Sequence, residues 1–284
     1  MITIQSINEI RTYLEQAKKK GEAIGFVPTM GFLHEGHGAL IDHARQDNGQ
    51  VIVSIFVNPL QFGPNEDFDR YPRDLPKDQA FCEARGVDAI FAPSAKEMYG
   101  DEGAFTRIHV NALGDHLCGA SRPGHFDGVA TVVAKLFNIV QPHRAYFGKK
   151  DFQQLSIVKR LVKDLSIPTE VVGVDIVREA DGLAKSSRNA YLTAEDRMVA
   201  PELNKSLNRI QAQVKNGAND LDTLIDAERS RLAAFERITL DYLTCVDVTK
   251  LQPIHQLDVG EQVVCAIAAF VGNTRLIDNV LLTK

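Results

Sequence analysis

Two histidines three residues apart, His34 and His37, stand among glycines in the stretch VPTMGFLHEGHGAL, residues 27–40. Residues at this spacing lie on the same side of a helical turn, so both imidazoles can point at one ligand. We predict that a strand ends at Val27 and that a helix begins around the histidines. The unpaired N–H groups and the dipole of a helix N-terminus attract phosphate, so the pair is a candidate anion site.

Two other interpretations of this stretch stay open from the residues alone. A zinc site would need a third ligand, and its usual spacing is H-E-x-x-H rather than the H-E-G-H found here. A purely structural origin, with glycines at a tight turn and histidines on the surface, is also compatible with so short a motif. The Walker A pattern G-x-x-x-x-G-K-[ST] does not occur in the sequence.

A second polar cluster follows another apolar run in YFGKKDFQQLSI, residues 146–157. Lys149 and Lys150 stand beside a glycine at a predicted strand-to-helix turn, where their ammonium groups could hold phosphate. Asp151 could cap the helix or accept a nucleoside hydroxyl, and the glutamine pair that follows suits a hydroxylated or carboxylate ligand. A charged, capped helix start on the surface fits the same residues.

A third cluster, KSSRNAYL at residues 185–192, combines two serine hydroxyls with flanking cations, which together make a flexible anion clamp. A polar loop between domains fits the same composition. Four more polar residues stand at ends of predicted strands or helices, namely Asn58, Gln61, Arg122 and His125. Ligands of open α/β sheets bind at the carboxyl edge of the strands, so these ends are where we expect ligand contacts.

The elements that must position these residues alternate along the first part of the chain. Apolar runs predict strands at residues 23–29, 51–57, 87–93, 144–148 and 170–177. Helical patterns between them begin near His34, Leu75, Phe126 and Phe152. Strands alternating with helices, several of them apolar throughout, are typical of a parallel sheet covered on both faces. We therefore predict a Rossmann-like, doubly wound α/β domain over residues 1–176.

A smaller C-terminal α+β domain is predicted over residues 177–284. Residues 193–217 predict one helix, with Thr193 and Asp196 in capping-box positions, and a second polar helix follows near 220–235. Three strand-like runs close the chain at residues 238–248, 262–272 and 274–282. Helices followed by a run of strands are typical of an α+β domain, and we expect this one to close over the site.

The composition argues against several classes of protein. Of the 284 residues, 44% are hydrophobic and 24% are charged, as in a globular protein. A net charge of −5 argues against a nucleic-acid partner, because binding to the phosphate backbone needs a basic face. The four cysteines form no C-x-x-C pair, which argues against a zinc site or disulfide framework and predicts reduced thiols in the cytoplasm.

Neither a membrane span nor a signal peptide is expected. The longest apolar runs, at residues 51–57 and 263–272, fall far short of the ~20 residues that span a bilayer. Near the N-terminus, four apolar residues occur at helical spacing among polar ones, namely Ile4, Ile7, Ile10 and Leu14. This pattern predicts a helix at a mature N-terminus rather than a secretory signal, and therefore a soluble protein without membrane contact.

Five motifs occur in one order between residues 28 and 193: PTMGFLHEGH, FVNPLQF, ASRPGHFDGV, GKKDFQQL and KSSRNAYLT, with RLIDN following at 275–279. Together they closely resemble the pantoate–beta-alanine ligase family, in which HEGH is a variant of the HIGH motif of a nucleotidyltransferase superfamily. The resemblance implies that the carboxylate of pantoate attacks the α-phosphorus of ATP, giving pantoyl adenylate and pyrophosphate. The amine of beta-alanine then attacks the acyl carbon and releases AMP and pantothenate. Mg²⁺ with the ATP and a homodimer are also implied.

The resemblance further implies a role for each matching residue. It assigns ATP binding to Met30, Gly31, Phe32, Leu33, His34, Glu35, Gly36, His37, Gly148, Lys149, Lys150, Asp151, Val177, Lys185, Ser186, Ser187 and Arg188. It assigns pantoate contacts to Gln61 and Gln154, of which Gln61 also contacts beta-alanine, and it identifies no metal ligand. It places His37 in the catalytic position of proton donor, and we predict that His34, Lys150 and Arg188 are catalytic with it.

The predicted catalytic residues agree with the chemistry of adenylation. The reaction needs preorganised positive charge on the phosphates as pyrophosphate leaves, and two histidines, a lysine and an arginine supply it locally. Lys149 and Lys185 depart from the family pattern, where a glutamate and an apolar residue are common. Both departures bear on ATP affinity more than on the type of reaction.

Two other functions compete with ligation. A nucleotidyltransferase that adenylylates a phosphate substrate would leave Gln61 and Gln154 without a use and would consume no amine. A nucleotide-binding regulatory protein with a degenerate site would bind ATP without producing AMP, since a fold does not determine a function.

Overall fold

The computed structural model describes residues 1–64 and 66–284 of the chain. Its contacts divide the chain into two compact units. Unit 1 consists of Met1–Val110, Arg122–Lys149 and Ile157–Asp175, and unit 2 consists of Asn111–Ser121, Lys150–Ser156 and Ile176–Lys284. The last boundary lies one residue before the predicted one, whereas the two short stretches of unit 2 have no counterpart in the prediction.

Unit 1 is built on a six-stranded sheet in which every pairing is parallel. Its strands are β1 (Ile2–Ile4), β2 (Ile24–Thr29), β3 (Gln50–Ile55), β4 (Ala89–Phe91), β5 (Arg144–Gly148) and β6 (Glu170–Val174). The order is β1-β4-β3-β2-β5-β6. Because the chain winds outward from β2 through β3 to β4 and then resumes at β5 on the other side of β2, the predicted doubly wound sheet is confirmed.

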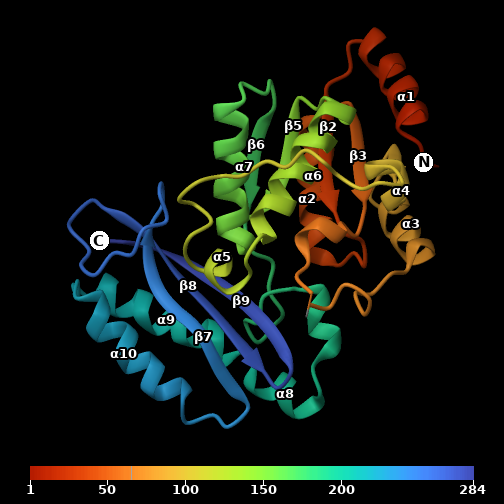
Figure 1. Cartoon of the computed structure of the whole chain (residues 1–284). Helices are drawn as coiled ribbons and strands as arrows, with labels where there is room; N and C mark the ends of the chain where they lie inside the picture. The colour runs from red at the N-terminus through yellow and green to blue at the C-terminus, as the bar shows by residue number, and fades with distance from the viewer. Residues whose placement is uncertain (65) are drawn as a thin grey trace. The chain divides into compact units, whose positions relative to one another are not determined.

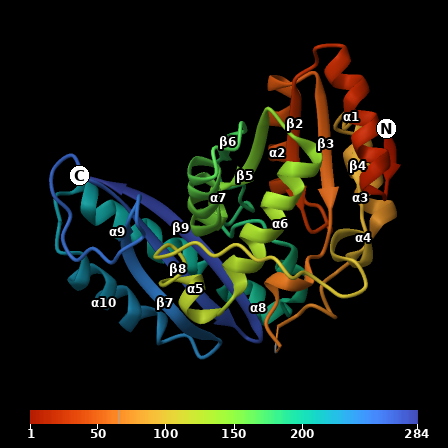
Figure 2. The same ribbon diagram turned by 45° about the horizontal axis from the view of Figure 1, so that its top comes forward.

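Helices cover both faces of this sheet (Figures 1 and 2). They are α1 (Ile7–Lys19), α2 (Glu35–Asp47), α3 (Leu75–Glu83), α4 (Ala95–Tyr99), α6 (His125–Val140) and α7 (Phe152–Asp164), of which α7 begins in unit 2 and continues into unit 1. Successive strand residues point to opposite faces. Accordingly, the ring of Phe26 lies 6.4 Å from that of Phe137 in α6, whereas Val27 packs with Leu40 and Ile41 of α2.

The N-terminal segment differs from its prediction. Ile4, expected at the start of a helix, lies in β1, where it pairs with Phe91 of the parallel strand β4. The helix begins only at Ile7, after the N-cap Ser6. A strand of three residues is too short to show an alternating pattern, and its pairing partner lies far along the chain. The predicted strand at 170–177 likewise ends earlier, at Val174.

Unit 2 holds the predicted three strands as an antiparallel meander in the order β7-β8-β9. Its elements are α5 (Cys118–Ser121), α8 (Ala194–Val199), α9 (Glu202–Lys215), α10 (Leu221–Leu232), β7 (Ile238–Asp247), β8 (Gln262–Val271) and β9 (Thr274–Thr283). The helix predicted over 193–217 is divided into α8 and α9 at Pro201, which lacks the N–H that a continuous helix requires. Thr193 caps α8 as predicted, since its hydroxyl accepts the backbone N–H of Asp196.

Candidate active site

The turn between β2 and α2 carries the loop of residues 30–34. Gly31 and Phe32 take positive φ angles of 84° and 52°, so the chain turns sharply as it leaves the strand. A Cβ on Gly31 would lie 2.9 Å from Cγ2 of Ile55, and therefore only glycine fits there. The loop delivers His34 to the N-terminus of α2, where this residue is the N-cap.

The two histidines at the start of α2 have the same tautomer. Nδ1 of His34 accepts a hydrogen bond from the backbone N–H of Gly36 at 3.1 Å, and Nδ1 of His37 accepts one from the backbone N–H of His34 at 3.3 Å. A backbone N–H only donates, so each neutral imidazole must carry its proton on Nε2. The first turn of α2 therefore presents two Nε2–H donors where the helix dipole favours an anion.

A buried carboxylate holds this loop in place. Asp78 in α3 accepts the backbone N–H groups of Phe32 at 2.8 Å and Leu33 at 2.7 Å. Its burial raises the pKa of this carboxyl, although the two N–H bonds act in the opposite direction. Asp78 was not predicted, because it follows Phe32 by 46 residues and no pattern in the sequence distinguishes it from other acidic residues.

Gln61 lies beside the first residue of the loop. It is the last residue of a short 3₁₀ helix, η1 (Pro59–Gln61), which follows β3, and it is buried. Its Nε2 donates to Sδ of Met30 at 3.1 Å, and its Oε1 accepts from Nδ2 of Asn58 at 3.0 Å. Unit 1 thus brings a predicted pantoate contact next to the predicted ATP loop.

Arg122 and His125 hold the backbone of Gln61. Nδ1 of His125 lies 2.8 Å from the Gln61 carbonyl oxygen, and its Nε2 lies 3.0 Å from Nη1 of Arg122. A carbonyl only accepts and a guanidinium only donates, so the proton of this neutral imidazole is on Nδ1.

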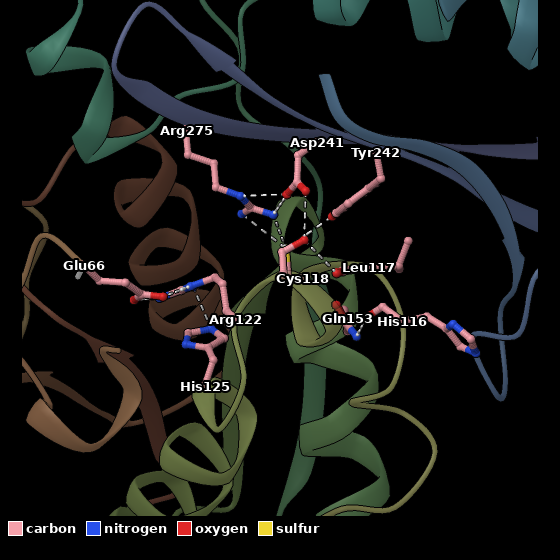
Figure 3. A network of polar contacts seen from close by, with 11 residues as sticks. Glu66, His116, Leu117, Cys118, Arg122, His125, Gln153, Asp241, Tyr242 and Arg275 are labelled. Atoms are coloured by element: carbon pink, nitrogen blue, oxygen red, sulfur yellow. Dashed lines mark hydrogen bonds and ion pairs between the residues drawn. The ribbon is translucent and has the colours of Figure 1, made fainter. Parts of the chain in front are cut away.

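Arg122 is itself fixed by Glu66, to which it donates through Nε at 2.8 Å and Nη2 at 2.5 Å (Figure 3). Burial tends to raise the pKa of Glu66, but the hydrogen bond and positive charge of Arg122 outweigh it and hold that pKa below its usual value. The pair is therefore an ion pair at neutral pH. It secures the imidazole of His125 from the side opposite Gln61.

The end of β5 carries another predicted ATP segment. The direction of winding changes between the neighbouring strands β2 and β5, and doubly wound sheets bind ligands at such a position. Gly148 ends β5 and the loop of residues 30–34 follows β2, so both lie at this position. Nζ of Lys149 donates to Oδ1 of Asp175 at 2.6 Å, and 47% of the Lys149 side chain is exposed. This lysine is thus paired with an acidic residue that follows the neighbouring strand β6.

Lys150 and Asp151 belong to unit 2, where they precede α7. Nζ of Lys150 lies 3.3 Å from Oδ2 of Asp151, and 19% of the Lys150 side chain is exposed. The carbonyl of Lys150 accepts a hydrogen bond from Nδ2 of Asn279 in β9 at 2.8 Å. The RLIDN motif therefore fastens this segment through its asparagine. Gln154 lies half-buried in the first turn of α7.

Two of the remaining predicted ATP residues, Val177 and Lys185, stand at the ends of a hairpin in unit 2. The backbone N–H of Lys185 donates to the carbonyl of Val177 at 2.9 Å. Between them, Arg178 makes two hydrogen bonds to the buried carboxylate of Asp278 in β9, at 2.7 and 2.9 Å. The aspartate of RLIDN thus anchors the hairpin whose ends carry Val177 and the serine cluster.

The serine cluster starts another 3₁₀ helix, η3 (Ser187–Tyr191). Oγ of Ser186 accepts the backbone N–H of Arg188 at 3.3 Å, so Ser186 is its cap. Ser187 is buried. Nζ of Lys185 lies 2.9 Å from a carboxylate oxygen of Glu179, so this lysine, like Lys149, is paired with an acidic residue.

Comparison with known proteins decides the family. A family model described as pantoate-beta-alanine ligase matches residues 2–281. The chain belongs to this family. The pantothenate synthetase of Thermotoga petrophila is 49% identical over 282 residues, covering 99% of this chain and 100% of that protein. The one from Moorella thermoacetica is 51% identical over 282 residues, covering 99% of each.

Solved structures agree with this assignment. The pantothenate synthetase of Thermus thermophilus matches with a TM-score of 0.93 and 47% identity over 100% of both chains. The pantoate-beta-alanine ligase of Francisella tularensis, solved as a complex with beta-gamma ATP and beta-alanine, matches with a TM-score of 0.80 and 36% identity over 99% of this chain and 97% of that one. As a pantoate–beta-alanine ligase, this chain joins pantoate to beta-alanine through pantoyl adenylate and releases AMP and pyrophosphate.

The residues predicted for the ligase site fall into one group in each unit. Unit 1 holds residues 30–37, Gln61, Gly148 and Lys149. Unit 2 holds Lys150, Asp151, Gln154, Val177 and residues 185–188. The boundary between the units thus falls between the adjacent lysines Lys149 and Lys150.

A second network in the ligase lies within unit 2 and was not predicted. Figure 3 shows Cys118 beside Tyr242, whose hydroxyl is 3.2 Å from Sγ, and beside Arg275, whose two Nη atoms are each 3.6 Å from Sγ. Arg275 also pairs with Asp241 at 2.7 Å. This network joins the short stretch Asn111–Ser121 to the strands of the meander, which explains why that stretch groups with unit 2.

Neither a protein-bound metal centre nor a membrane helix occurs in the described parts of the chain. Over residues 1–64 and 66–284, no group of three or more His, Cys, Asp or Glu side chains could hold a metal ion. The helices in the same residues are too short or too polar to cross a bilayer. All four cysteines are free thiols.

Proposed function

We propose that His34 and His37, as Nε2–H donors, and Lys150 and Arg188, as cations, stabilise the negative charge that adenylation of pantoate develops. A carboxylate oxygen of pantoate forms a bond to the α-phosphorus of ATP, while the bond from that phosphorus to the bridging oxygen breaks and pyrophosphate leaves. Negative charge grows on the phosphate oxygens during this exchange. Preorganised donors aimed at that charge are usually the largest source of catalysis in such a site.

The observation that carries this proposal is the pair of Nε2–H donors at the first turn of α2. Both imidazoles use Nδ1 as an acceptor for backbone N–H groups, so neither needs to rotate before it can donate to phosphate. His37 is the proton donor that the family resemblance implies. The loop of residues 30–34, held by Asp78, supports the same anion with the N-terminus of α2.

Gln61 and Gln154 are proposed to bind pantoate, and Gln61 also beta-alanine. Amide side chains can meet both hydroxyl and carboxylate groups without adding charge to a site that already binds a polyanion. In the second step, the amine of beta-alanine attacks the acyl carbon, the bond from that carbon to the AMP oxygen breaks, and pantothenate forms. The side chain of Arg188 is proposed to hold the phosphate of AMP as it leaves.

Mg²⁺ is proposed to arrive with ATP as part of the substrate. The described residues offer no three-ligand cage, and Mg²⁺ commonly binds through substrate phosphates and water rather than through an all-protein site. We assign no protein ligand to it. The homodimer, the cytoplasmic location and closure of the C-terminal domain over the site stay predictions, and light scattering after gel filtration tests the first of them.

The test is AMP formation from ATP with pantoate and beta-alanine, each omitted in turn. Pantoate and ATP alone should support exchange of labelled pyrophosphate into ATP, because the first step is reversible on the enzyme. Pantoate labelled with ¹⁸O in its carboxylate should pass one label to AMP. Unlabelled AMP would exclude the acyl adenylate.

A further inference from the structure

The amide of Asn58 has only one possible orientation. The residue is buried, with 1% of its surface exposed, and lies immediately before η1. Its Nδ2 is 3.1 Å from the carbonyl oxygen of Gly128, and its Oδ1 is 3.3 Å from the backbone N–H of Leu60. The carbonyl only accepts and the N–H only donates, so exchanging the nitrogen and the oxygen of this amide would break both hydrogen bonds.

The orientation of Asn58 determines that of Gln61. Because Nδ2 of Asn58 also donates to the side chain of Gln61 at 3.0 Å, Gln61 must present Oε1 on that side. Its Nε2, with two N–H donors, then faces Met30 at 3.1 Å. One of these donors meets the weakly accepting thioether sulfur of Met30, and so Gln61 reaches the predicted site as a donor and not as an acceptor.

A third residue completes this chain of hydrogen bonds. The hydroxyl of Tyr99, the last residue of α4, lies 2.8 Å from Oδ1 of Asn58. Oδ1 only accepts, so the tyrosine hydroxyl is the donor. Burial raises the pKa of Tyr99, which keeps this hydroxyl protonated, and its ring packs against that of Phe56, 6.0 Å away between centroids.

The backbone of Gln61 is fixed independently of this chain. His125 donates to its carbonyl at 2.8 Å. Arg122 donates to the other ring nitrogen of His125 and is itself paired with Glu66 (Figure 3). Loss of the Tyr99 hydroxyl therefore leaves the position of η1 intact and acts on the side-chain amides alone.

We propose that Tyr99 is a positioning residue for substrate recognition. Its hydroxyl adds a third hydrogen bond to the amide of Asn58, besides those with Gly128 and Leu60, and Asn58 in turn holds Gln61 with its Nε2–H donors toward the site. The substrate group met by Gln61 is therefore an acceptor oxygen, a carboxylate or hydroxyl of pantoate or the carboxylate of beta-alanine, and not the ammonium group of beta-alanine. This inference rests on the proposed role of Gln61 in binding pantoate.

The first test compares Tyr99→Phe with Tyr13→Phe. Tyr13, in α1, donates to Oε1 of Gln50 at 2.8 Å, so the control removes the same kind of tyrosine–amide bond away from η1. We expect Tyr99→Phe to raise the KM for pantoate about three- to tenfold, with the KM for ATP unchanged, since one hydrogen bond is lost. Tyr13→Phe should change neither. A pantoate KM unaltered in Tyr99→Phe would overturn the proposal.

Coupling separates positioning from a general structural effect. In a Gln61→Ala background, Tyr99→Phe should have no further effect on the KM for pantoate, because the side chain that it positions is gone. If Tyr99→Phe raises the KM for pantoate as much in that background as in the wild type, Tyr99 does not act through Gln61, although the role of Gln61 itself would be unaffected. An unchanged KM for pantoate in Gln61→Ala alone would instead overturn the role of Gln61 in binding pantoate, and with it the positioning role of Tyr99.

Polarity is tested at Gln61 itself. Gln61→Glu keeps the shape of the side chain and an acceptor for Asn58, but it presents an acceptor where the site needs a donor. It should therefore weaken pantoate binding more than Gln61→Met, which has nearly the same length and no hydrogen-bonding end. Pantoate binding by Gln61→Glu equal to that of the wild type would show that Gln61 accepts, and would overturn the assigned polarity.

Discussion

The rings of His34 and His37 lie against each other with centroids 4.2 Å apart and planes inclined by 37°. Each ring is fixed at Nδ1 by a backbone N–H of the first turn of α2, so the helix itself sets the tautomer of both. Because each Nδ1 accepts a backbone N–H, both rings act as Nε2–H donors. The arrangement supports the proposal that the first turn of α2 binds phosphate, whereas a metal ion would need lone pairs on Nε2.

Removal of His37 or Lys150 should affect the two half-reactions unequally. Each alanine variant should slow adenylation about 10²–10³-fold, as loss of one preorganised donor does in other acyl- and phosphoryl-transfer sites. Supplied with synthetic pantoyl adenylate and beta-alanine, the same variants should show a clearly smaller deficit, because the acyl transfer develops its charge elsewhere. Arg188→Ala should be impaired in both steps, since this residue is proposed to hold departing AMP.

Circular dichroism serves as the control for these variants. If His37→Ala and Lys150→Ala are folded and yet as slow from the preformed adenylate as from ATP, the assignment of these residues to the first step is wrong.

The adjacent lysines should differ in their effect on ATP. Lys149 is 47% exposed and paired with Asp175, whereas Lys150 is 19% exposed. Lys149→Ala should change the KM for ATP less than about fivefold, since an ion pair between so exposed a lysine and a phosphate would contribute at most about 1 kcal/mol. Lys150→Ala should reduce kcat/KM for ATP far more. Initial rates over a range of ATP concentrations check this. An equal loss of kcat/KM for ATP in the two variants would show that Lys149 also contacts the phosphates.

Asp78→Ala should disturb the loop of residues 30–34. Two backbone N–H groups lose a charged acceptor, at about 1–3 kcal/mol each, so we expect roughly 2–6 kcal/mol of destabilisation and a higher KM for ATP. Asp74→Ala is the matched control, because Asp74 caps the same helix by accepting the backbone N–H of Lys77 in α3 rather than one from the loop. It should cost about 1 kcal/mol of stability and leave the KM for ATP unchanged. An equal rise in the KM for ATP in both variants would show that the effect comes from destabilising α3 and not from the bonds between Asp78 and the loop.

Glu66 should contribute to the loss of stability in acid. Its pKa in the folded protein lies below the ordinary value of 4.5, so as the pH falls past that value the unfolded chain takes up the proton first. The stabilisation is complete above 4.5 and is lost as the pH falls through the lower folded pKa. Urea unfolding across this range should therefore show a shallower acid loss in Glu66→Gln than in the wild type.

Asp78 should act in the opposite direction in the same experiment. Its folded pKa is raised above 3.8, so the folded state keeps its proton longer and loses stability as the pH rises through this region. Asp78→Asn removes that opposing contribution and should steepen the acid loss. Identical pH profiles for Glu66→Gln, Asp78→Asn and the wild type would contradict both assignments.

The sequence by itself determined the elements and residues whose signals are local. Apolar runs placed β2, β3, β4, β5 and β6, and the capping pattern placed the start of α8 at Thr193. The glycines and histidines after β2 indicated a helix N-terminus suited to phosphate. All of these depend on residues within a few positions of one another, where strand alternation, helix spacing and caps act.

Only the tertiary structure decided which distant groups fix the site residues. Ile4 joins a strand because β4 offers it a partner, Asp78 holds Phe32 across 46 residues, and Tyr99 reaches Asn58 across 41. In unit 2, Asn279 fastens Lys150 across 129 residues. A buried polar group needs a hydrogen-bond partner, and that partner can belong to any element that packs against it. The packing of whole elements determines which residue this is, so the spacing of residues in the sequence does not predict it.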